Sequence, residues 1–222
     1  MSDAAYTILI GSRNFSSWSL RGWLAAKLSG APFETKLFKF HTPERAQIAA
    51  ASPSGLVPAL TVTRSGQAPF TVWDSLAIGE FLAEAHPGAH LWPVDKFARA
   101  RARSVTAEMH SGFAELRRSC PMDILARAHN HPLNDETKRN VERIQLLWRE
   151  CRREYGSGGD FLFGSFSLAD CFYAPVVTRF VTYGVTLDAT ARAYVDAVTS
   201  WPAMKEWTQG AAQEEAERKK SG

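Results

Sequence analysis

Three serines within four residues, at Ser16, Ser17 and Ser19, stand directly before an apolar segment with helical spacing. Serine oxygens commonly accept hydrogen bonds from the free N–H groups of a helix N-terminus, and that structural role needs no ligand. The same position favours an anion, because the N–H groups and the helix dipole are positive there. If the anion is a ligand's thiolate, a donated hydrogen bond stabilises it by about 1.5–3 kcal/mol and lowers the thiol pKa by about one to two units. The turn is therefore a candidate catalytic centre, and the structural role stays open beside it.

Two other short segments combine a constrained backbone with polar groups. Val57 and Pro58 precede an apolar run, so a strand follows a constrained turn. A cis bond between them would turn the N–H and C=O of Val57 outward, as an edge for a peptide-like ligand. Asp74 and Ser75 precede an amphipathic stretch. Capping that helix is their ordinary role, and ligand binding at the helix N-terminus is the alternative.

The composition, with 45% hydrophobic and 22% charged residues in a chain of 222, is that of an ordinary soluble globular protein. A net charge of +3 without a dense basic block argues against nucleic-acid binding, and the lack of an apolar run of about 18 residues argues against a membrane span. The three cysteines form no C-x-x-C pair, so neither a disulfide framework nor a dithiol is expected. The first residues resemble no secretory leader, so we expect a cytoplasmic location. His129 and His131 have no further ligand at metal spacing, and no metal site is expected.

Hydrophobic periodicity divides the chain into two parts. In the first part, strands and amphipathic helices follow one another in the order βαβαββα, which is typical of an α/β thioredoxin-like domain. We expect strands at residues 6–10, 33–40, 59–63 and 70–73, and helices at residues 20–28, 43–51 and 76–85. This domain is assigned to residues 1–86, and a linker that contains Pro and Gly to residues 87–96.

The second domain, residues 97–222, lacks strand signals and is expected to be all-helical. Helical spacing occurs at residues 105–116, 141–155, 167–183, 191–199 and 202–209. The polar tail from Glu214 onward is expected to fray. Ser167 and Asp170 match the Ser-x-x-Asp capping box at the start of the third of these helices, and we interpret them as a structural cap.

The serine turn resembles a family motif. Residues 14–21 read Asn-Phe-Ser-Ser-Trp-Ser-Leu-Arg, which is similar to the Ser-Ser-Cys-x-x-Arg turn of zeta-class glutathione transferases and maleylacetoacetate isomerases. It is closer still to bacterial relatives that read Asn-(Tyr/Phe)-Ser-Ser-Trp-Ser-Leu-Arg. Ser16, Ser17 and Arg21 match the serine pair and the arginine of the motif. Trp18 stands where the zeta class has cysteine, and this departure weighs against isomerase activity.

The resemblance implies the architecture and reaction of a cytosolic glutathione transferase. Glutathione would be the co-substrate, and its bound thiolate would attack a small electrophile while the protein stabilises and orients it. Spacing does not choose between the adjacent serines, and we favour Ser17 over Ser16 as the hydroxyl that faces the sulfur. The helical domain would form the electrophile pocket, with Trp18, Met122 and Arg117 as candidate lining residues.

The resemblance also assigns the glutathione contacts. Val57 and a cis Pro58 would meet the peptide backbone of the ligand, since a cis proline at this position is the rule in thioredoxin-like domains. Asp74 would take the ammonium group of the γ-glutamyl end, and Ser75 with the helix N-terminus would take its carboxylate. The family usually has Gln or Glu where this chain has Asp74, and the shorter carboxylate still suits an ammonium group.

The resemblance further implies a symmetric homodimer. Apolar material for such an interface is offered by Phe70, Trp73, Leu76, Val105, Met109 and Phe113. Two other functions remain open, namely a glutathione-dependent cis–trans isomerase and a non-catalytic ligand-binding protein on the same scaffold. A thiol–disulfide oxidoreductase is disfavoured, because residues 12–20 contain no cysteine.

Overall fold

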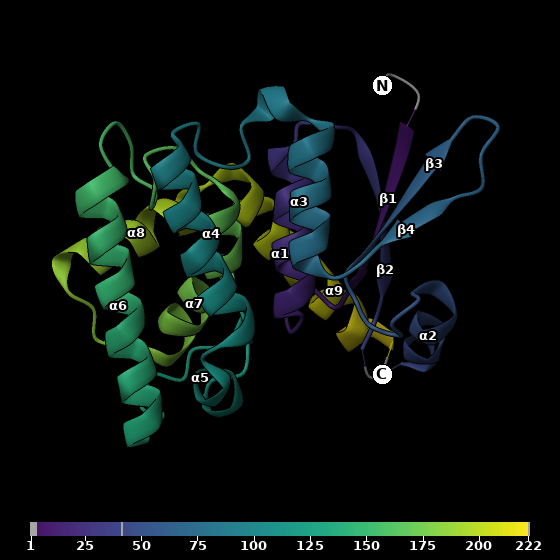
Figure 1. The fold of residues 1–222 in the computed structure, drawn as a ribbon. Helices are drawn as coiled ribbons and strands as arrows, with labels where there is room; N and C mark the ends of the chain where they lie inside the picture. The colour runs from purple at the N-terminus through teal and green to yellow at the C-terminus, as the bar shows by residue number, and fades with distance from the viewer. Residues whose placement is uncertain (1–3, 41, 222) are drawn as a thin grey trace. The chain divides into compact units, whose positions relative to one another are not determined.

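A four-stranded mixed sheet lies at the centre of the N-terminal part of the chain (Figure 1). The computed structural model describes residues 4–40 and 42–221. The strands are β1 (Ala4–Gly11), β2 (Phe33–Phe38), β3 (Ala59–Arg64) and β4 (Phe70–Val72), in the order β2-β1-β3-β4. β1 pairs in parallel with β2 and antiparallel with β3, and β3 pairs antiparallel with β4. All four expected strands are present.

Two helices, α1 (Ser17–Leu28) and α3 (Ser75–Ala85), lie side by side against this sheet (Figure 1). Their apolar side chains Leu20, Leu24 and Ile78 are fully buried, so these helices supply much of the hydrophobic core that holds them in place. Both expected helices are therefore confirmed, and each begins at a serine.

The short helix expected after β2 consists of a 3-10 turn, η1 (Pro43–Gln47), followed by the single α-helical turn α2 (Ile48–Ala51). Ile48 packs in a small cluster with Leu9 and Ala59 from β1 and β3. The apolar side chain of Ile48 thus anchors a segment that is too short to be stable as an isolated helix.

The strand register brings three polar segments to one end of the sheet. They are the serine turn at residues 16–19, the Val57–Pro58 pair and the Asp74–Ser75 pair. Leu9 is opposite Ala59 across the β1–β3 pair, and Leu60 is opposite Val72 across the β3–β4 pair. The end of β1, the start of β3 and the end of β4 therefore lie next to one another. In Figure 1 this is the lower end of the sheet, where α1 and α3 also begin.

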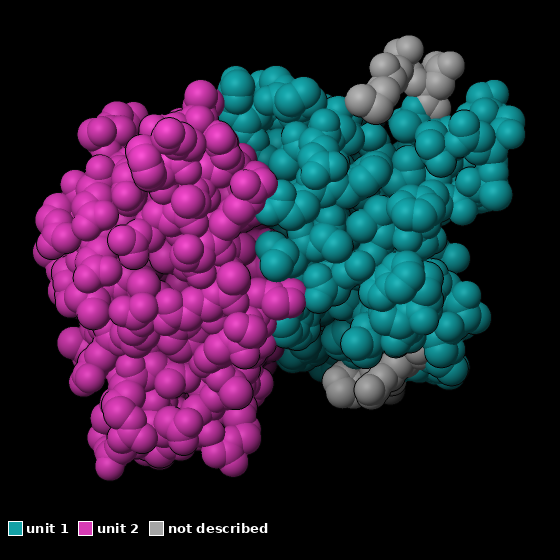
Figure 2. All heavy atoms as spheres, viewed as in Figure 1, with its two compact units in different colours: residues 1–91, 210–222 teal, residues 92–209 magenta. Residues whose placement is uncertain are grey.

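The chain divides into two compact units (Figure 2). Unit 1 contains Met1–Leu91 and Gly210–Gly222, and unit 2 contains Trp92–Gln209. From the sequence we expect the final residues in the helical domain, whereas their contacts group them with the sheet. The domain limits at residues 86 and 97 stay a prediction.

Unit 2 is helical apart from two isolated β-bridges, as far as the described residues go. The 3-10 turn η2 (Pro87–Ala89) precedes it. The α-helices that follow are α4 (Lys96–Ser111), α5 (Ala114–Ser119), α6 (Asp135–Tyr155), α7 (Leu168–Tyr183), α8 (Ala189–Ser200) and α9 (Pro202–Ser221), of which α9 continues into unit 1. Trp148 of α6 is fully buried, and its ring contacts those of Tyr173, Phe180 and Tyr194 at centroid distances of 4.7–5.8 Å. These aromatic contacts tie α6, α7 and α8 into one core.

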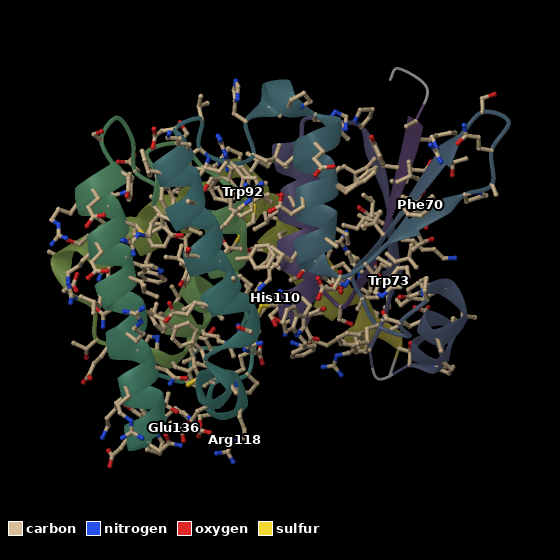
Figure 3. All side chains as sticks on the ribbon, viewed as in Figure 1. Phe70, Trp73, Trp92, His110, Arg118 and Glu136 are labelled. Atoms are coloured by element: carbon tan, nitrogen blue, oxygen red, sulfur yellow. The ribbon has the colours of Figure 1, made fainter. Side chains whose placement is uncertain are left out.

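A buried carboxylate joins α5 to the start of α6. Glu115 accepts hydrogen bonds from Ser119 (2.7 Å) and Asn134 (2.6 Å), and it is also bonded to Arg118. These donors hold the pKa of the Glu115 carboxyl at about 2. Arg118 and Glu136 lie at the ends of the two helices (Figure 3), where the Glu136 charge adds to the attraction for Arg118.

The helical spacing at residues 105–116 does not form one helix. Gly112 is extended, and Phe113 adopts a left-handed conformation (φ 55°) between α4 and α5. A Cβ atom at Gly112 would lie 2.6 Å from the Glu108 carbonyl oxygen, so only glycine fits this break. The guanidinium of Arg117 donates to the carbonyl oxygens of Met109 and Gly112 and so closes the end of α4.

The tail from Glu214, for which the polar sequence predicts fraying, is helical as far as Ser221. Glu214 and Glu217 explain the difference, because they form ion pairs with Arg13 and Lys39 of unit 1. Partners so far away in the sequence could not be read from the composition of the tail. No helix of the described part of the chain is both long and apolar enough to cross a membrane.

Candidate active site

The turn between β1 and α1 is organised by hydrogen bonds among its serines. Ser16 is the N-cap of α1, and its oxygen accepts from the Ser19 N–H (3.3 Å). The Ser16 hydroxyl donates to the Ser19 oxygen (2.7 Å), which also accepts from the Gly11 N–H (2.9 Å). Ser19 is fully buried and thus links the end of β1 to the first turn of α1.

Ser17 differs from its two neighbours. It is the first residue of α1 and is only 7% exposed, yet its hydroxyl makes no hydrogen bond with any described residue. Ser16 has both of its hydrogen-bonding roles occupied by Ser19. Of the two candidate hydroxyls, Ser17 therefore has the proton that is available for a ligand.

The start of α1 is electrostatically positive. α1 has no acidic residue in its first turn, so nothing there offsets the positive end of the helix dipole. Arg21 follows Ser17 by one helical turn and is fully buried. Its guanidinium carbon lies 4.3 Å from the centre of the Trp18 ring, a cation–π contact. The turn is thus an electrostatic environment in which an anion is favoured.

The Val57–Pro58 peptide bond is cis, as expected. Pro58 is buried against α1, where a Cβ atom at Gly22 would lie 2.9 Å from the Pro58 ring. Val57 is partly exposed, and neither its N–H nor its C=O is hydrogen-bonded to a described residue. The close packing of α1 therefore fixes an unpaired backbone edge beside the serine turn.

The N-terminus of α3 contains a buried hydroxyl group without a hydrogen-bond partner among the described residues. The N-cap Asp74 is exposed, and its carboxylate accepts from the Leu76 N–H (3.0 Å). Ser75 is fully buried, and its hydroxyl oxygen has no hydrogen-bond partner among the described residues. An unpaired buried hydroxyl costs about 1–3 kcal/mol. A ligand carboxylate that accepts this bond would remove the cost.

At the start of α7, by contrast, the buried polar side chains are hydrogen-bonded to one another. Ser167 and Asp170 form a reciprocal capping box, and the Asp170 carboxylate also accepts from the Leu162 N–H (3.1 Å) and the Tyr194 hydroxyl (3.0 Å). Complete burial raises the pKa of the Asp170 carboxyl to about 6, although the four donors oppose this shift. The Ser167 and Asp170 side chains at this helix start thus both have internal partners.

The three residues expected in an electrophile pocket belong to different units. Trp18 is in unit 1, and Met122 (3% exposed) and Arg117 are in unit 2. Burial lowers the pKa of Arg117, whose donors are directed to the carbonyl groups at the end of α4. A pocket shared by these residues stays a prediction.

None of the cysteines has the environment of a reactive thiol. All three are buried and free. Burial raises the pKa of the Cys120 thiol to about 11, that of Cys151 to about 12 and that of Cys171 well above its ordinary value. Such thiols are poor nucleophiles at neutral pH. Among the described residues, no group of three His, Cys, Asp or Glu side chains could hold a metal ion.

Two residues of this region were not identified from the sequence. Ser19 was grouped with its neighbours, although it is the acceptor that organises the turn. Glu214 accepts from the backbone N–H of Arg13 (3.0 Å) and from its side chain (2.6 Å). The role of Ser19 could have been predicted from its i,i+3 spacing to Ser16, whereas no local sequence signal indicates the role of Glu214.

Two domain models of one family match the chain. Residues 15–85 match the model described as glutathione S-transferase, N-terminal domain, and residues 134–210 match the model described as glutathione S-transferase, C-terminal domain. Together the matches span about two thirds of the chain. They include the serine turn, the cis proline and the start of α3.

A protein from Caenorhabditis elegans named probable maleylacetoacetate isomerase is 26% identical over 167 residues, which cover 73% of this chain and 75% of that protein. Among solved structures, glutathione transferase Omega 2S from Trametes versicolor is similar with a TM-score of 0.73 and 20% identity, covering 97% of this chain and 98% of the other. Maleylacetoacetate isomerase from Anaeromyxobacter dehalogenans, solved with bound glutathione, has a TM-score of 0.66 and 23% identity, covering 93% and 96%. These structural likenesses establish the fold.

Proposed function

Because this chain belongs to the glutathione S-transferase superfamily, we propose that it binds glutathione and activates the thiol for attack on a small electrophile. The proposal takes the three polar segments at one end of the sheet as the glutathione site. It assigns Ser17 as the hydroxyl that faces the sulfur, with Ser16 as the alternative.

One observation carries the proposal. Two serines in the first turns of neighbouring helices, Ser17 and Ser75, are buried and make no side-chain hydrogen bond with a described residue. Buried polar groups are almost always paired in folded proteins. The unsatisfied Ser75 hydroxyl and the available Ser17 hydroxyl are explained together by one anionic ligand that has a thiolate at one end and a carboxylate at the other.

The remaining contacts fit the same ligand. In this proposal Val57 and cis Pro58 present the backbone edge that pairs with the cysteinyl part of glutathione. The exposed Asp74 carboxylate takes the γ-glutamyl ammonium, and the Ser75 hydroxyl with the free N–H groups of α3 takes the γ-glutamyl carboxylate. A structural neighbour was solved with bound glutathione, which supports glutathione as the ligand by analogy.

The chemical step follows from the electrostatics of the serine turn. The bound thiol loses its proton to water, and the thiolate accepts a hydrogen bond from Ser17 in the field of the α1 N-terminus and Arg21. The thiolate sulfur then forms a bond to the electrophilic carbon. The leaving group departs with the electron pair of its bond, or, in an addition, the product takes up a proton. The protein contributes thiolate stabilisation and orientation, and none of its own side chains forms a covalent intermediate.

A second function, glutathione-dependent cis–trans isomerisation, is favoured by one finding, namely that a relative of this chain is named probable maleylacetoacetate isomerase. In that reaction the thiolate adds to an activated double bond, the new single bond rotates, and the thiolate leaves again. The glutathione site and Ser17 would serve both reactions, so activity on a cis-enone substrate separates them.

We also propose that the working form is a cytoplasmic homodimer. Phe70 and Trp73 support an interface, because they lie on and just after β4 and are 55% and 46% exposed (Figure 3). Val105 and Met109, named as candidates from the sequence, are buried in unit 2 and serve its own core instead. Sedimentation equilibrium should give about twice the 24.6 kDa chain mass, and a monomer throughout the concentration series would refute the dimer.

The proposed function is tested by binding and turnover together. Calorimetry should detect glutathione binding to the wild-type protein, and a panel of electrophiles that includes a cis-enone should reveal turnover. Ser17→Ala should lower turnover about ten- to hundredfold with little change in glutathione affinity, because the γ-glutamyl contacts remain. Full turnover at about pH 6.5 in Ser16→Ala, Ser17→Ala and the double variant would exclude the serine mechanism. Binding without turnover on any electrophile would instead indicate a ligand-binding protein.

A further inference from the structure

The last helix reaches back to the serine turn. The two carboxylate oxygens of Glu214 accept from the same residue, one from the Arg13 backbone N–H (3.0 Å) and one from the Arg13 guanidinium (2.6 Å). Both side chains are mostly buried, with exposures of 21% for Arg13 and 13% for Glu214. A partly buried, charge-assisted contact with two bonds is a strong and directional constraint.

The face of α9 that contacts Arg13 has a glycine where the arginine side chain lies. Gly210, Glu214 and Glu217 follow one another at spacings of four and three residues, so they share one face of the helix. A Cβ atom at Gly210 would lie 2.7 Å from Arg13 Cδ, so glycine leaves the space that the arginine side chain occupies. Glu217 pairs with Lys39 (2.9 Å) in a more exposed position. Both ion pairs lie within unit 1.

The Glu214–Arg13 contact is connected to the Ser17 hydroxyl through the backbone of the turn between β1 and α1. The Phe15 and Ser16 N–H groups both donate to the Ser12 carbonyl oxygen (3.1 and 2.9 Å), so Arg13 lies inside a closed turn that leads directly into α1. The Ser12 side chain accepts from the Phe40 N–H (2.8 Å). The turn is thus held from outside at Ser12, by Phe40, which is the second residue after β2, and at Arg13, by α9. Only the second of these contacts involves a charge.

We propose that Glu214 is a positioning residue for the reaction. By clamping Arg13, it holds the turn between β1 and α1, and with it the Ser17 hydroxyl, in the orientation that stabilises a bound thiolate. This inference rests on the proposed glutathione function and adds to it a residue that is 197 positions away from Ser17 in the sequence. Glu214 touches neither the ligand nor the reacting atoms in this account. It acts through Arg13.

Three variants perturb the clamp in different ways. Glu214→Ala removes both hydrogen bonds. Gly210→Ala introduces a methyl group into the space of the Arg13 side chain while leaving Glu214 intact. Glu214→Gln keeps an oxygen that can accept from the Arg13 N–H but removes the ion pair. Glu217→Ala is the matched control, because it breaks the ion pair that the same helix face makes with Lys39 and leaves Glu214 in place.

Each full-length variant is assayed for kcat, for KM of glutathione and for the pKa of the bound thiol, followed by ultraviolet thiolate absorbance. Glu214→Ala and Gly210→Ala should lower kcat about tenfold and raise the thiol pKa by about 0.5–1 unit. KM for glutathione should change less than about twofold, since Asp74, Ser75 and Val57 are untouched. Glu214→Gln should be intermediate, and Glu217→Ala should match the wild type.

Two results would overturn the inference. One is an unchanged kcat and thiol pKa in both Glu214→Ala and Gly210→Ala. The other is an equal loss in Glu217→Ala, which would mean that α9 acts only by general docking. If the wild type binds no glutathione, the proposed function fails, and amide hydrogen exchange then decides the clamp alone. Faster exchange at residues 12–19 in Glu214→Ala but not in Glu217→Ala supports the clamp, and equal exchange in all proteins contradicts it.

Discussion

Serine and aspartate occur at helix starts in both units, but their hydrogen bonding there is opposite. At the start of α7, Ser167 and Asp170 are hydrogen-bonded to one another, and Asp170 also accepts from Leu162 and Tyr194. At the start of α3, Asp74 accepts from one N–H while the buried Ser75 hydroxyl has no partner among the described residues. At the start of α1, the Ser17 hydroxyl also makes no hydrogen bond with a described residue. A helix start whose groups are all paired stabilises the fold, and one that leaves a hydroxyl unpaired is prepared for a ligand.

The energetic reason for this difference is that a hydroxyl without a hydrogen bond costs free energy inside the protein, whereas in water it bonds to the solvent. A buried hydroxyl without a partner costs about 1–3 kcal/mol, which is a sizeable fraction of the net stability of a folded domain. Unit 1 would tolerate this cost at Ser75 if ligand binding recovers it. The α7 start has no such cost to recover, because Asp170 has four donors.

The largest effect is expected at Asp170. Asp170→Ala should lower the free energy of unfolding by about 3–5 kcal/mol, because it leaves several buried donors without an acceptor. Chemical denaturation measures the change. Glutathione affinity of the folded fraction should equal that of the wild type. A loss below about 1 kcal/mol would remove the contrast between the two kinds of helix start.

The same carboxyl should make stability depend on pH. Its pKa is raised from 3.8 to about 6 in the folded protein, so the native state binds the proton more readily than the unfolded chain. The stabilisation of about 2–3 kcal/mol is complete below about pH 4 and is lost as the pH rises through about 6. Asp170→Asn should lack this contribution when unfolding is compared with the wild type across this range. Parallel pH profiles for the two proteins would contradict the prediction.

Asp74→Asn should weaken glutathione binding by about 1.5–3 kcal/mol through the loss of a charge-assisted contact. Stability should change little, since asparagine is also a good N-cap. The matched control is Asp95→Asn, because Asp95 is the N-cap of α4 and accepts from Phe97 and Ala98. Calorimetry that gives equal affinities for wild type and Asp74→Asn would remove Asp74 from the site.

The smallest effects distinguish the serines most sharply. Ser167→Ala should cost about 1–2 kcal/mol of stability and leave glutathione affinity unchanged. Ser75→Ala should leave the stability of the ligand-free protein unchanged or slightly higher, because an unpaired buried hydroxyl is removed, and should weaken glutathione binding by about 1 kcal/mol. Equal destabilisation by both substitutions, measured by thermal unfolding without glutathione, would show that Ser75 is an ordinary cap.

Local patterns predicted most of the fold. Apolar alternation and helical spacing gave the four strands and the helices α1, α3 and α6–α8, because each of these elements buries a face that its own sequence defines. The serine turn and the Asp-Ser pair were identified in the same way. Helix starts are encoded by a few adjacent residues, so their location is readable before any tertiary structure is known.

The features that the sequence did not predict depend on distant partners. The break at Gly112 and Phe113 is closed by Arg117, whose bonds to carbonyl groups leave no trace in hydrophobic spacing. The helical tail of α9 depends on Arg13, which is 201 residues away from Glu214. Whether Ser75 is paired or unpaired likewise depends on what surrounds the helix start and not on the residues that form it.

The central claim is that the Ser17 hydroxyl stabilises a bound glutathione thiolate, and a pH titration of the bound thiol tests it most directly. Ultraviolet thiolate absorbance of the glutathione complex should give a pKa about one to two units below that of the free thiol in the wild type. In Ser17→Ala the value should return most of the way to that of free glutathione, whereas Ser167→Ala should match the wild type. A depressed pKa that persists unchanged in Ser17→Ala would contradict the account.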